Sequence, residues 1–414
     1  MIKRTFIYSL LVMLLAVTGL RGQTTNSGVL YVSKDTKFAT VERFDNKESG
    51  EFYNDGEAFI YNHFNNDGIL DYYGETGFTQ FVGNAVQQLT GTKVSYLYDV
   101  FFNNNSNPAP FQLSGALDIS GVSDFYQGIV DNDNFGGSIT FSRTGSHANT
   151  SNESHIDGMV YKAGSDKFTF PIGDGGFYRF AGSSELNAPS LYTAKFFYEN
   201  SDALYPHSEK VNSLDAIDHQ EYWRIEKESD NKDDILITLS WSNDTTPSEF
   251  IAAAAQNALT VVRWNEASNR WINEGGNINM SNQTVTTAVT GYGIYTFGIL
   301  NEADILPCGL TVYNAVTPNG DGIHDSFVID AGQTDCIRDL KVQIFNRWGV
   351  KVFESNNYGE NGEVFKGYST GRLTVNGSRQ LPTGTYFYMV DYEYGDPSAN
   401  TRYKQTGYLY LITD

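Results

Sequence analysis

The residues best placed to do chemistry are three oxygen-bearing side chains on one glycine-rich turn, Asn319, Asp321 and Asp325. Carboxylate and amide oxygens are the ligands that Ca²⁺ prefers, so the turn is a candidate calcium site. It lacks the full acidic pattern and the distal Glu of an EF-hand, and an ordinary polar turn is the alternative. Pro318 fixes φ at the start of this turn, and the glycines on it permit left-handed backbone. Calcium is the one cofactor that the sequence suggests.

No catalytic motif accompanies this turn. The six histidines have no paired metal-binding spacing; they are His63, His147, His155, His207, His219 and His324. The sequence contains no Gly-x-Ser-x-Gly nucleophile turn and no phosphate-binding glycine loop followed by Lys and Ser or Thr. We therefore predict a protein without enzymatic activity. Because the 35 acids of residues 23–300 offer many pairs, a secreted polysaccharide-active hydrolase with an unrecognised acidic site is the alternative.

The two cysteines, Cys308 and Cys336, both lie in the last third of the chain. A close pair in an exported protein usually forms a disulfide. Closing a loop of about 29 residues would stabilise the fold by roughly 3 kcal/mol, because it restricts the unfolded chain. Two free buried thiols are the alternative.

The charge of the chain excludes some classes of partner. The 414 residues include 49 acidic and 28 basic side chains, for a net charge of −21. Residues 23–300 carry 35 of the acids and 16 of the bases. Such a protein repels nucleic acid and anionic membranes, so we expect neither as a partner. Abundant Gly, Tyr and Phe with few Pro favour an all-β protein of many short strands.

Residues 1–22 have the pattern of a secretory signal peptide. Lys3 and Arg4 form a basic start, an apolar run extends to Leu20, and Gly22 is a small residue at a plausible cleavage point. A membrane anchor is the alternative, but the apolar run of about 16 residues is shorter than the ~20 that a spanning helix needs. We predict an exported protein whose mature form has no transmembrane helix.

The segment 23–157 carries regular turns between very short strands. Asn54-Asp55-Gly56 and Asn66-Asp67-Gly68 recur twelve residues apart, each followed by an apolar stretch. This pattern predicts a β-solenoid, whose coils stack their apolar residues into one core. An irregular β-sandwich is the alternative. Calcium ions between the coils at these turns are a further hypothesis.

The segments 158–302 and 303–414 have longer strands. In the first, Ile235, Ile237, Leu239 and Trp241 alternate with polar neighbours, which predicts a β-sandwich. A capping Thr246, followed by Pro and Glu249, predicts one short helix that begins there. The last segment alternates similarly and ends on a final strand.

Four ordered motifs in residues 311–414 resemble the gliding-motility-associated C-terminal domain, the type B sorting domain of the Bacteroidetes type IX secretion system. They are Ala315-Val-Thr-Pro-Asn-Gly-Asp-Gly322 with Asp325, Ile344-Phe-Asn-Arg-Trp-Gly349, Leu381-Pro-Thr-Gly-Thr-Tyr-Phe-Tyr388 and Gly407-Tyr-Leu-Tyr-Leu-Ile412. Two positions depart from the family: His324 stands where Asn is usual, and Phe365-Lys366-Gly367 replaces a Trp-Asp/Asn-Gly. Phe168–Asp174 and Glu221–Arg224 also look similar to segments of flavobacterial surface proteins.

The resemblance implies an address for secretion and an Ig-like β-sandwich fold for the last segment. Such proteins enter the periplasm, cross the outer membrane through the type IX translocon and associate with a small outer-membrane barrel partner. They then stay at the cell surface or enter the medium. The implied motif residues are Thr317, Pro318, Asn319, Gly320, Asp321, Gly322, Asp325, Asn346, Arg347, Trp348, Gly349, Pro382, Gly384, Tyr386 and Gly407.

Arg347 and Trp348 have two physical interpretations. Arg and aromatic side chains dominate binding hot spots, which favours a recognition pair. Alternatively, Trp348 belongs to the core and Arg347 pairs with an acid such as Asp325. For the rest of the chain we predict a non-catalytic, adhesin-like or structural surface protein, whose exposed Tyr, Asn and Asp bind glycans or other surface components.

Overall fold

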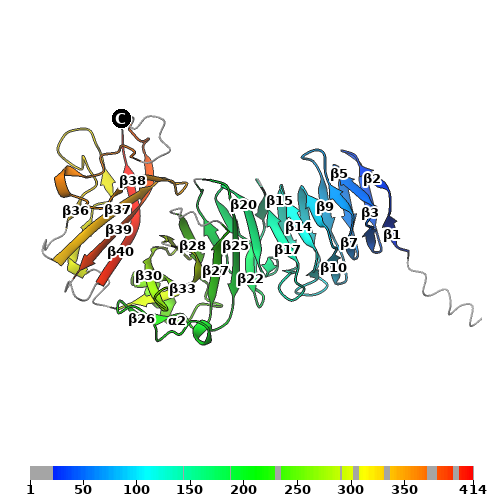
Figure 1. The fold of residues 1–414 in the computed structure, drawn as a ribbon, viewed down its shortest axis with the longest axis horizontal. Coiled ribbons are helices and arrows are strands. Elements are labelled where there is room, and N and C mark those ends of the chain that lie inside the picture. The colour runs from blue at the N-terminus through cyan, green and yellow to red at the C-terminus, as the bar shows by residue number, and fades with distance from the viewer. Residues whose placement is uncertain are drawn as a thin grey trace, which may run out of the picture. The chain divides into compact units, whose positions relative to one another are not determined.

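A computed structural model describes residues 22–142, 144–186, 188–228, 235–289, 291–301, 307–330, 336–370, 380–394 and 401–413. These residues are almost all in β-strands and turns (Figure 1), which confirms the predicted all-β class. The chain forms two compact units, one of residues up to 139 with 145–149, and one of residues 140–144 with 150–414. The first unit has the predicted solenoid fold.

The first unit is a parallel β-solenoid of about six coils, in which three sheets run along the stack. The first solenoid sheet contains β1 (Thr24–Asn26), β4 (Phe44–Asn46), β7 (Phe64–Asn66), β10 (Gln87–Thr90), β13 (Phe111–Leu113) and β16 (Val130–Asp131). The second contains β2 (Val29–Val32), β5 (Glu51–Asn54), β8 (Ile69–Asp71), β11 (Val94–Leu97) and β14 (Ala116–Ile119). The third contains β3 (Lys37–Thr40), β6 (Glu57–Ile60), β9 (Phe78–Phe81), β12 (Asp99–Asn103), β15 (Val122–Gln127) and β18 (Ser146–Ala148).

Stacked aromatic rings fill the solenoid interior. Phe44 and Phe64 stack with ring centroids 5.9 Å apart, and Phe102 stacks between Phe81 and Phe125 at 5.5 and 5.3 Å. All five side chains are buried, and burying each contributes about 1.5–3 kcal/mol. The inward apolar positions of successive coils therefore form one continuous core, as the solenoid prediction requires.

A ladder of asparagines closes one corner of the first coils. The Asn26 side-chain amide donates to Asn46 Oδ1 at 2.9 Å, and Asn46 donates to Asn66 Oδ1 at 2.8 Å. Successive members are 20 residues apart, so 20 residues is the coil repeat here. The twelve-residue recurrence of Asn-Asp-Gly is not a repeat, because Asn54 ends a strand of the second sheet and Asn66 ends one of the first.

The second unit begins with the predicted sandwich. One sheet has the order β20-β25-β27-β33-β29-β30, with β26 also paired to β33, and the other has the order β21-β24-β28-β32-β31. The bounds are β20 (Val160–Gly164), β21 (Phe168–Phe170), β24 (Ala181–Ser183), β25 (Ser190–Phe197), β26 (Leu214–Ile217), β27 (Tyr222–Lys227), β28 (Leu236–Ser240), β29 (Leu259–Asn265), β30 (Arg270–Gly275), β31 (Asn277–Asn279), β32 (Thr284–Ala288) and β33 (Gly293–Leu300). Shorter strands are β17 (Ser138–Phe141), β19 (Ile156–Asp157), β22 (Ile172–Asp174) and β23 (Phe177–Tyr178). Ile235, Ile237 and Leu239 are all buried, as their alternation predicts.

The predicted helix is present as α2 (Ser248–Ala255), but its predicted cap is wrong. Pro247 occupies the N-cap position and no side chain caps the helix. The Thr246 hydroxyl donates instead to Glu221 Oε1 at 2.5 Å, because Glu221 is buried and needs donors.

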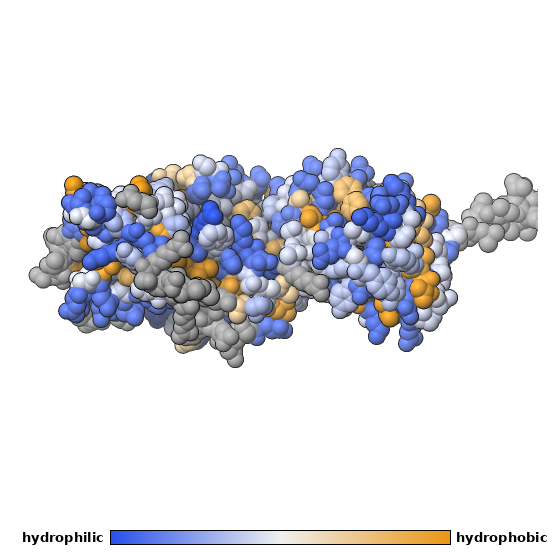
Figure 2. All heavy atoms as spheres, turned by 90° about the horizontal axis from the view of Figure 1, so that it is seen from above, coloured by the Kyte–Doolittle hydropathy of each residue, from blue (hydrophilic) through white to orange (hydrophobic). Residues whose placement is uncertain are grey.

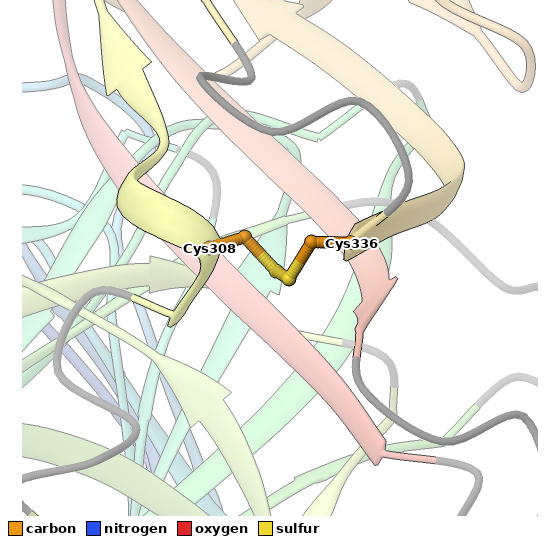
Figure 3. Close-up of a disulfide and its surroundings, with 2 residues drawn as sticks. All are labelled: Cys308 and Cys336. Atoms are coloured by element: carbon orange, nitrogen blue, oxygen red, sulfur yellow. A yellow bond between two sulfur atoms is a disulfide. The ribbon is translucent and has the colours of Figure 1, made fainter.

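The last segment is built on a five-stranded sheet with the order β35-β40-β39-β37-β38, beside a two-stranded pair, β34-β36. The strands are β34 (Thr311–Val312), β35 (Ala315–Val316), β36 (Ile329–Asp330), β37 (Ile337–Phe345), β38 (Lys351–Ser355), β39 (Gly384–Tyr394) and β40 (Thr401–Leu411). Single 3₁₀ turns occur at η2 (Ser201–Ala203), η4 (Pro307–Gly309) and η6 (Glu360–Gly362). A disulfide joins Cys308 in η4 to Cys336 just before β37 (Figure 3), the bridge that the sequence predicts.

Candidate functional site

All four sequence motifs meet at one end of the five-stranded sheet. Val316, at the end of β35, pairs with Leu411, which in turn pairs with Gly384 at the start of β39. Phe345, at the end of β37, pairs with Phe387. The Thr317–Asp325 turn, the Asn346–Gly349 turn and the Pro382–Tyr386 segment therefore all lie at this end, which we call the motif end.

The Thr317–Asp325 turn is held by its own acids. Asp325 accepts the Gly320 amide at 2.7 Å on Oδ1 and the Gly322 amide at 2.8 Å on Oδ2. Asp321 accepts the Ile323 amide at 2.7 Å and the Asn319 side-chain amide at 3.0 Å, and these bonds lower its pKa. The two glycines have φ of 81° and 85°, which favours glycine at both positions. Main-chain hydrogen bonding thus explains why this turn needs these residue types.

Asn346 organises the hairpin between β37 and β38. Its Oδ1 accepts the main-chain amides of Trp348 at 3.0 Å and Val350 at 2.9 Å, and Gly349 has a φ of 83°. The turn presents Trp348 with 42% of its surface exposed, and the Arg347 guanidinium lies 4.2 Å from the Trp348 ring centroid. Trp348 is therefore not a core residue, and among the described residues no ion pair joins Arg347 to Asp325. This geometry favours the recognition-pair interpretation.

The remaining motif residues support the sheet itself. Tyr386 is buried, and its hydroxyl donates to the Pro382 carbonyl at 2.8 Å, which fixes the entry to β39. Gly407 lies opposite Tyr388, and a Cβ at Gly407 would come within 2.5 Å of the Tyr388 hydroxyl oxygen. Only glycine leaves room there for the aromatic side chain.

Residues 310–411 match the family model of the CHU_C type IX secretion signal domain. This match is consistent with a type B C-terminal sorting domain, and it marks the protein as one exported by the type IX secretion machinery to the cell surface or the extracellular space. No curated protein and no solved structure matches the chain significantly.

Three of the sequence predictions concern membranes, leaders and metals. The predicted signal peptide lies almost entirely outside the described residues, and within those residues no helix is long and apolar enough to cross a membrane. The described part of the chain also contains no group of three or more His, Cys, Asp and Glu side chains that could hold a metal ion. The Thr317–Asp325 turn offers two carboxylates and one amide, and calcium there stays a prediction.

The solenoid presents a second candidate site, a group of tyrosines on the outer face of its second sheet and in the bend that follows β8. We call Tyr31, Tyr53, Tyr73 and Tyr96 the tyrosine face. Tyr31, Tyr73 and Tyr96 are 50%, 73% and 47% exposed, and Tyr31 pairs with Tyr53 across the strands. Apolar residues are also exposed at the N-terminal end of the solenoid (Figure 2). A monomeric protein rarely leaves clustered aromatic and apolar side chains exposed without a binding role.

The tyrosine rings are held in place before any ligand arrives. Tyr53 and Tyr73 stack with centroids 4.5 Å apart, and Tyr31 packs edge-on to Tyr73 at 5.8 Å. The Tyr31 hydroxyl donates to Asp55 Oδ2 at 2.9 Å, while Asp55 Oδ1 accepts the Tyr73 amide at 2.9 Å. A hydrogen bond with Tyr73 raises the pKa of Tyr53 to about 12. The result is an ordered aromatic surface with hydroxyls and carboxylates interspersed.

The sequence analysis did not identify these four tyrosines individually. The signal that distinguishes them is alternation within two short strands, since Leu30 and Phe52 point inward and Tyr31 and Tyr53 point outward. The strands are too short for the pattern to stand out without the coil register that aligns them. The acids of the Asn-Asp-Gly turns also form hydrogen bonds with neighbouring coils. Asp67, for example, accepts hydrogen bonds from both the main-chain amide and the hydroxyl of Thr92.

The sandwich contains a buried acid pair that the sequence analysis also missed. The Glu221 carboxylate receives two hydrogen bonds from Arg179, at 3.1 and 2.9 Å, and both side chains are buried. Asp218 is fully buried, and its Oδ2 has no hydrogen-bond partner among the described residues. Burial, and then repulsion by Glu221, raises the pKa of Asp218 well above its usual value.

We expect Asp218→Asn to stabilise the second unit at neutral pH. A carboxyl whose pKa is raised on folding stabilises the protein only while it is protonated, and this stability is lost as pH rises from about 4 through the folded pKa. Removing about 1 kcal/mol of this cost would raise the melting temperature by roughly 2–4 °C. Thermal melting of wild type and variant at pH 4 and pH 7.5 is the measurement. An equal difference at both pH values would contradict the account.

Proposed function

We propose that this protein is a non-catalytic, adhesin-like surface protein whose solenoid binds glycans. Residues 1–22 direct it to the periplasm, and its C-terminal domain directs it through the type IX translocon with an outer-membrane barrel partner. The match of residues 310–411 to a type IX secretion signal domain supports the export part of this route. The gliding machinery of Bacteroidetes is the context in which such a protein would contribute to attachment.

The tyrosine face is the observation that carries the binding proposal. Sugar rings present C–H groups on their faces and hydroxyls on their edges. Exposed tyrosines provide large, rigid surfaces for the apolar faces, at a low cost in side-chain entropy. The hydroxyl of Tyr53 and the carboxylates of Glu51 and Asp55 lie beside the rings and provide donors and acceptors for the edges. Because the acidic surroundings would repel anionic polysaccharides, the expected ligand is a neutral glycan.

The binding test uses purified protein and immobilised neutral polysaccharides. The triple variant Tyr31→Ala, Tyr73→Ala and Tyr96→Ala is expected to lose at least about tenfold in affinity, because each lost aromatic contact contributes on the order of 0.5–1.5 kcal/mol. Tyr126→Ala is the matched control, because Tyr126 is 61% exposed but lies on a strand of the third sheet.

Two outcomes would count against this proposal. If the triple variant and the Tyr126→Ala control bind equally well, the tyrosine face is not the glycan site. If the protein instead degrades a polysaccharide, and mutation of one acid pair abolishes turnover, the secreted hydrolase is the correct function. Calcium binding has its own test, because an unchanged melting temperature on addition of a chelator would exclude a structural calcium ion.

A further inference from the structure

Strand β39 of the sorting domain is buried on both of its faces. Tyr388 and Val390 point into the core of the sorting domain. Phe387 and Met389 point to the opposite side, and yet they are only 3% and 9% exposed. Phe345 pairs with Phe387 across the sheet and is also buried. We call this opposite side of the sheet its second face, and something other than the sorting-domain core must cover it.

The sandwich covers the second face. Phe345, Phe387 and Met389 form a cluster with Ala288 of β32, and Leu236 of β28 packs against the same cluster. Both contributing strands belong to the same sheet of the sandwich. The main chain is joined as well, because the Glu185 amide donates to the Trp348 carbonyl at 2.9 Å. One of the sorting motifs thus contacts the preceding domain directly.

A buried charge lies beside this apolar contact. Lys404 of β40 has its side chain 7% exposed, and its Nζ lies 3.1 Å from Glu274 Oε2 of the sandwich. The same ammonium donates to the Ala288 carbonyl. The other oxygen of Glu274 accepts Arg263 Nε at 2.8 Å, and both of these residues belong to the sandwich. Lys404 is therefore a member of this charged group that comes from the sorting domain.

Alternation along β40 explains why Lys404 lies there. Tyr403, Gly407 and Leu409 face the sorting-domain core, whereas Lys404 and Thr406 face the sandwich and are buried by it. Further along the same side, Tyr408 and Tyr410 are exposed. The sandwich covers only part of the second face, and Lys404 marks the covered part.

The buried ion pair favours one orientation of the sorting domain on the sandwich. A buried lysine without its partner costs several kcal/mol, so a position of the sorting domain that separates Lys404 from Glu274 without hydrating both is disfavoured. Burial of the apolar cluster stabilises the contact but does not depend on direction. The ion pair and the Trp348 hydrogen bond require a defined geometry and therefore set the orientation of the two domains.

We propose that the sandwich (residues 150–301) is a dedicated docking platform for the sorting domain, latched by Lys404 on Glu274. In the latched protein the covered part of the second face, around Phe387, Met389 and Lys404, is unavailable to the secretion machinery or to any other partner. Release requires the ion pair to separate and leaves the sandwich's own Arg263–Glu274 pair intact. This inference is independent of glycan binding by the solenoid.

The test measures thiol labelling in the otherwise intact chain. The sequence has only two cysteines, both in the disulfide, so Met389→Cys provides a unique free thiol. We expect its reaction with a maleimide to be at least about 100-fold slower than that of Tyr410→Cys, which is exposed on the same side of the sheet. Adding Lys404→Glu places two carboxylates together and should accelerate labelling of Cys at 389 by roughly tenfold or more, since tenfold corresponds to about 1.4 kcal/mol. Lys404→Met, which keeps the length without the charge, removes the ion pair but adds no repulsion, so it should accelerate labelling less than Lys404→Glu does.

A second pair of variants separates release from unfolding. Val390→Cys lies one residue away but faces the sorting-domain core, and Val390 is 0% exposed. It should stay protected in the Lys404→Glu background if the domain undocks, and should react if the domain unfolds. If Lys404→Glu unfolds the domain, Leu236→Asn is used instead, because it weakens the contact from the sandwich side. Labelling at positions 389 and 390 is then compared in the Leu236→Asn chain in the same way. Labelling at 389 as fast as at 410 in the chain without latch mutations would overturn the proposal. So would slow labelling at 389 in both the Lys404→Glu and the Leu236→Asn chains.

Discussion

Deletion of residues 303–414 is expected to abolish display of the protein at the cell surface and to leave the rest of it in the periplasm. The deleted part contains all of the segment that matches a type IX secretion signal domain. It also contains the disulfide and every motif that meets at the motif end, so no part of the secretion signal is left. Immunoblotting of periplasmic, outer-membrane and culture-medium fractions is the measurement.

The cell fractions must be collected soon after expression of the truncated protein begins. Without the sorting domain, Leu236 and Ala288 lose the cluster that covers them, and exposed apolar surface invites degradation. The full-length protein, expressed at the same level, is the control for recovery in each fraction. Truncated protein that reaches the surface in normal amounts would exclude the sorting function of residues 303–414.

Asn46→Leu is expected to destabilise the solenoid by about 3 kcal/mol, because three hydrogen bonds of a buried amide are lost at ~1 kcal/mol each. Asn46 is fully buried, donates to Asn66 and to the Ile69 carbonyl, and accepts from Asn26. Leucine has nearly the same shape, so the substitution removes hydrogen bonds rather than volume. Urea unfolding followed by circular dichroism measures the loss.

Asn105→Leu is the matched control, because Asn105 is exposed in the same unit and its replacement should change stability by less than about 0.5 kcal/mol. A similar stability for the two variants would mean that the ladder does not hold the coils together. A larger loss for Asn46→Leu would agree with the cooperative stacking of coils, in which each coil is stabilised by its neighbours.

The sequence predicted the parts of the fold that depend on local alternation. Ile237 and Leu239 are buried as expected, because a strand with one apolar face is stable only when that face is turned toward the core. Four motifs in a fixed order identified the sorting domain, because turns such as that around Asn346 require particular residues for backbone reasons. The disulfide followed from the small number of cysteines.

The features that the sequence could not supply depend on distant partners. Thr246 looked like a helix cap, but the buried Glu221 competes for its hydroxyl, and this residue is 25 positions away. Two Asn-Asp-Gly turns looked like a repeat, although they lie at different corners of the coil. From the sequence alone, Lys404 looks like an ordinary solvent-facing residue of a strand. Its role appears only when the sandwich is packed against it. In each case the deciding contact joins segments whose proximity follows from the tertiary fold alone.

The most direct measurement of the central claim, export of the solenoid to the cell exterior, is labelling of one solenoid position in living cells. Tyr73→Cys places a thiol at a position that is 73% exposed, on a full-length chain whose own cysteines are in a disulfide. A membrane-impermeant maleimide is added to intact cells and to cells with a permeabilised outer membrane, and labelled protein is counted on cells and in the medium. The account predicts equal labelling in both preparations. Labelling that appears only after permeabilisation would contradict it.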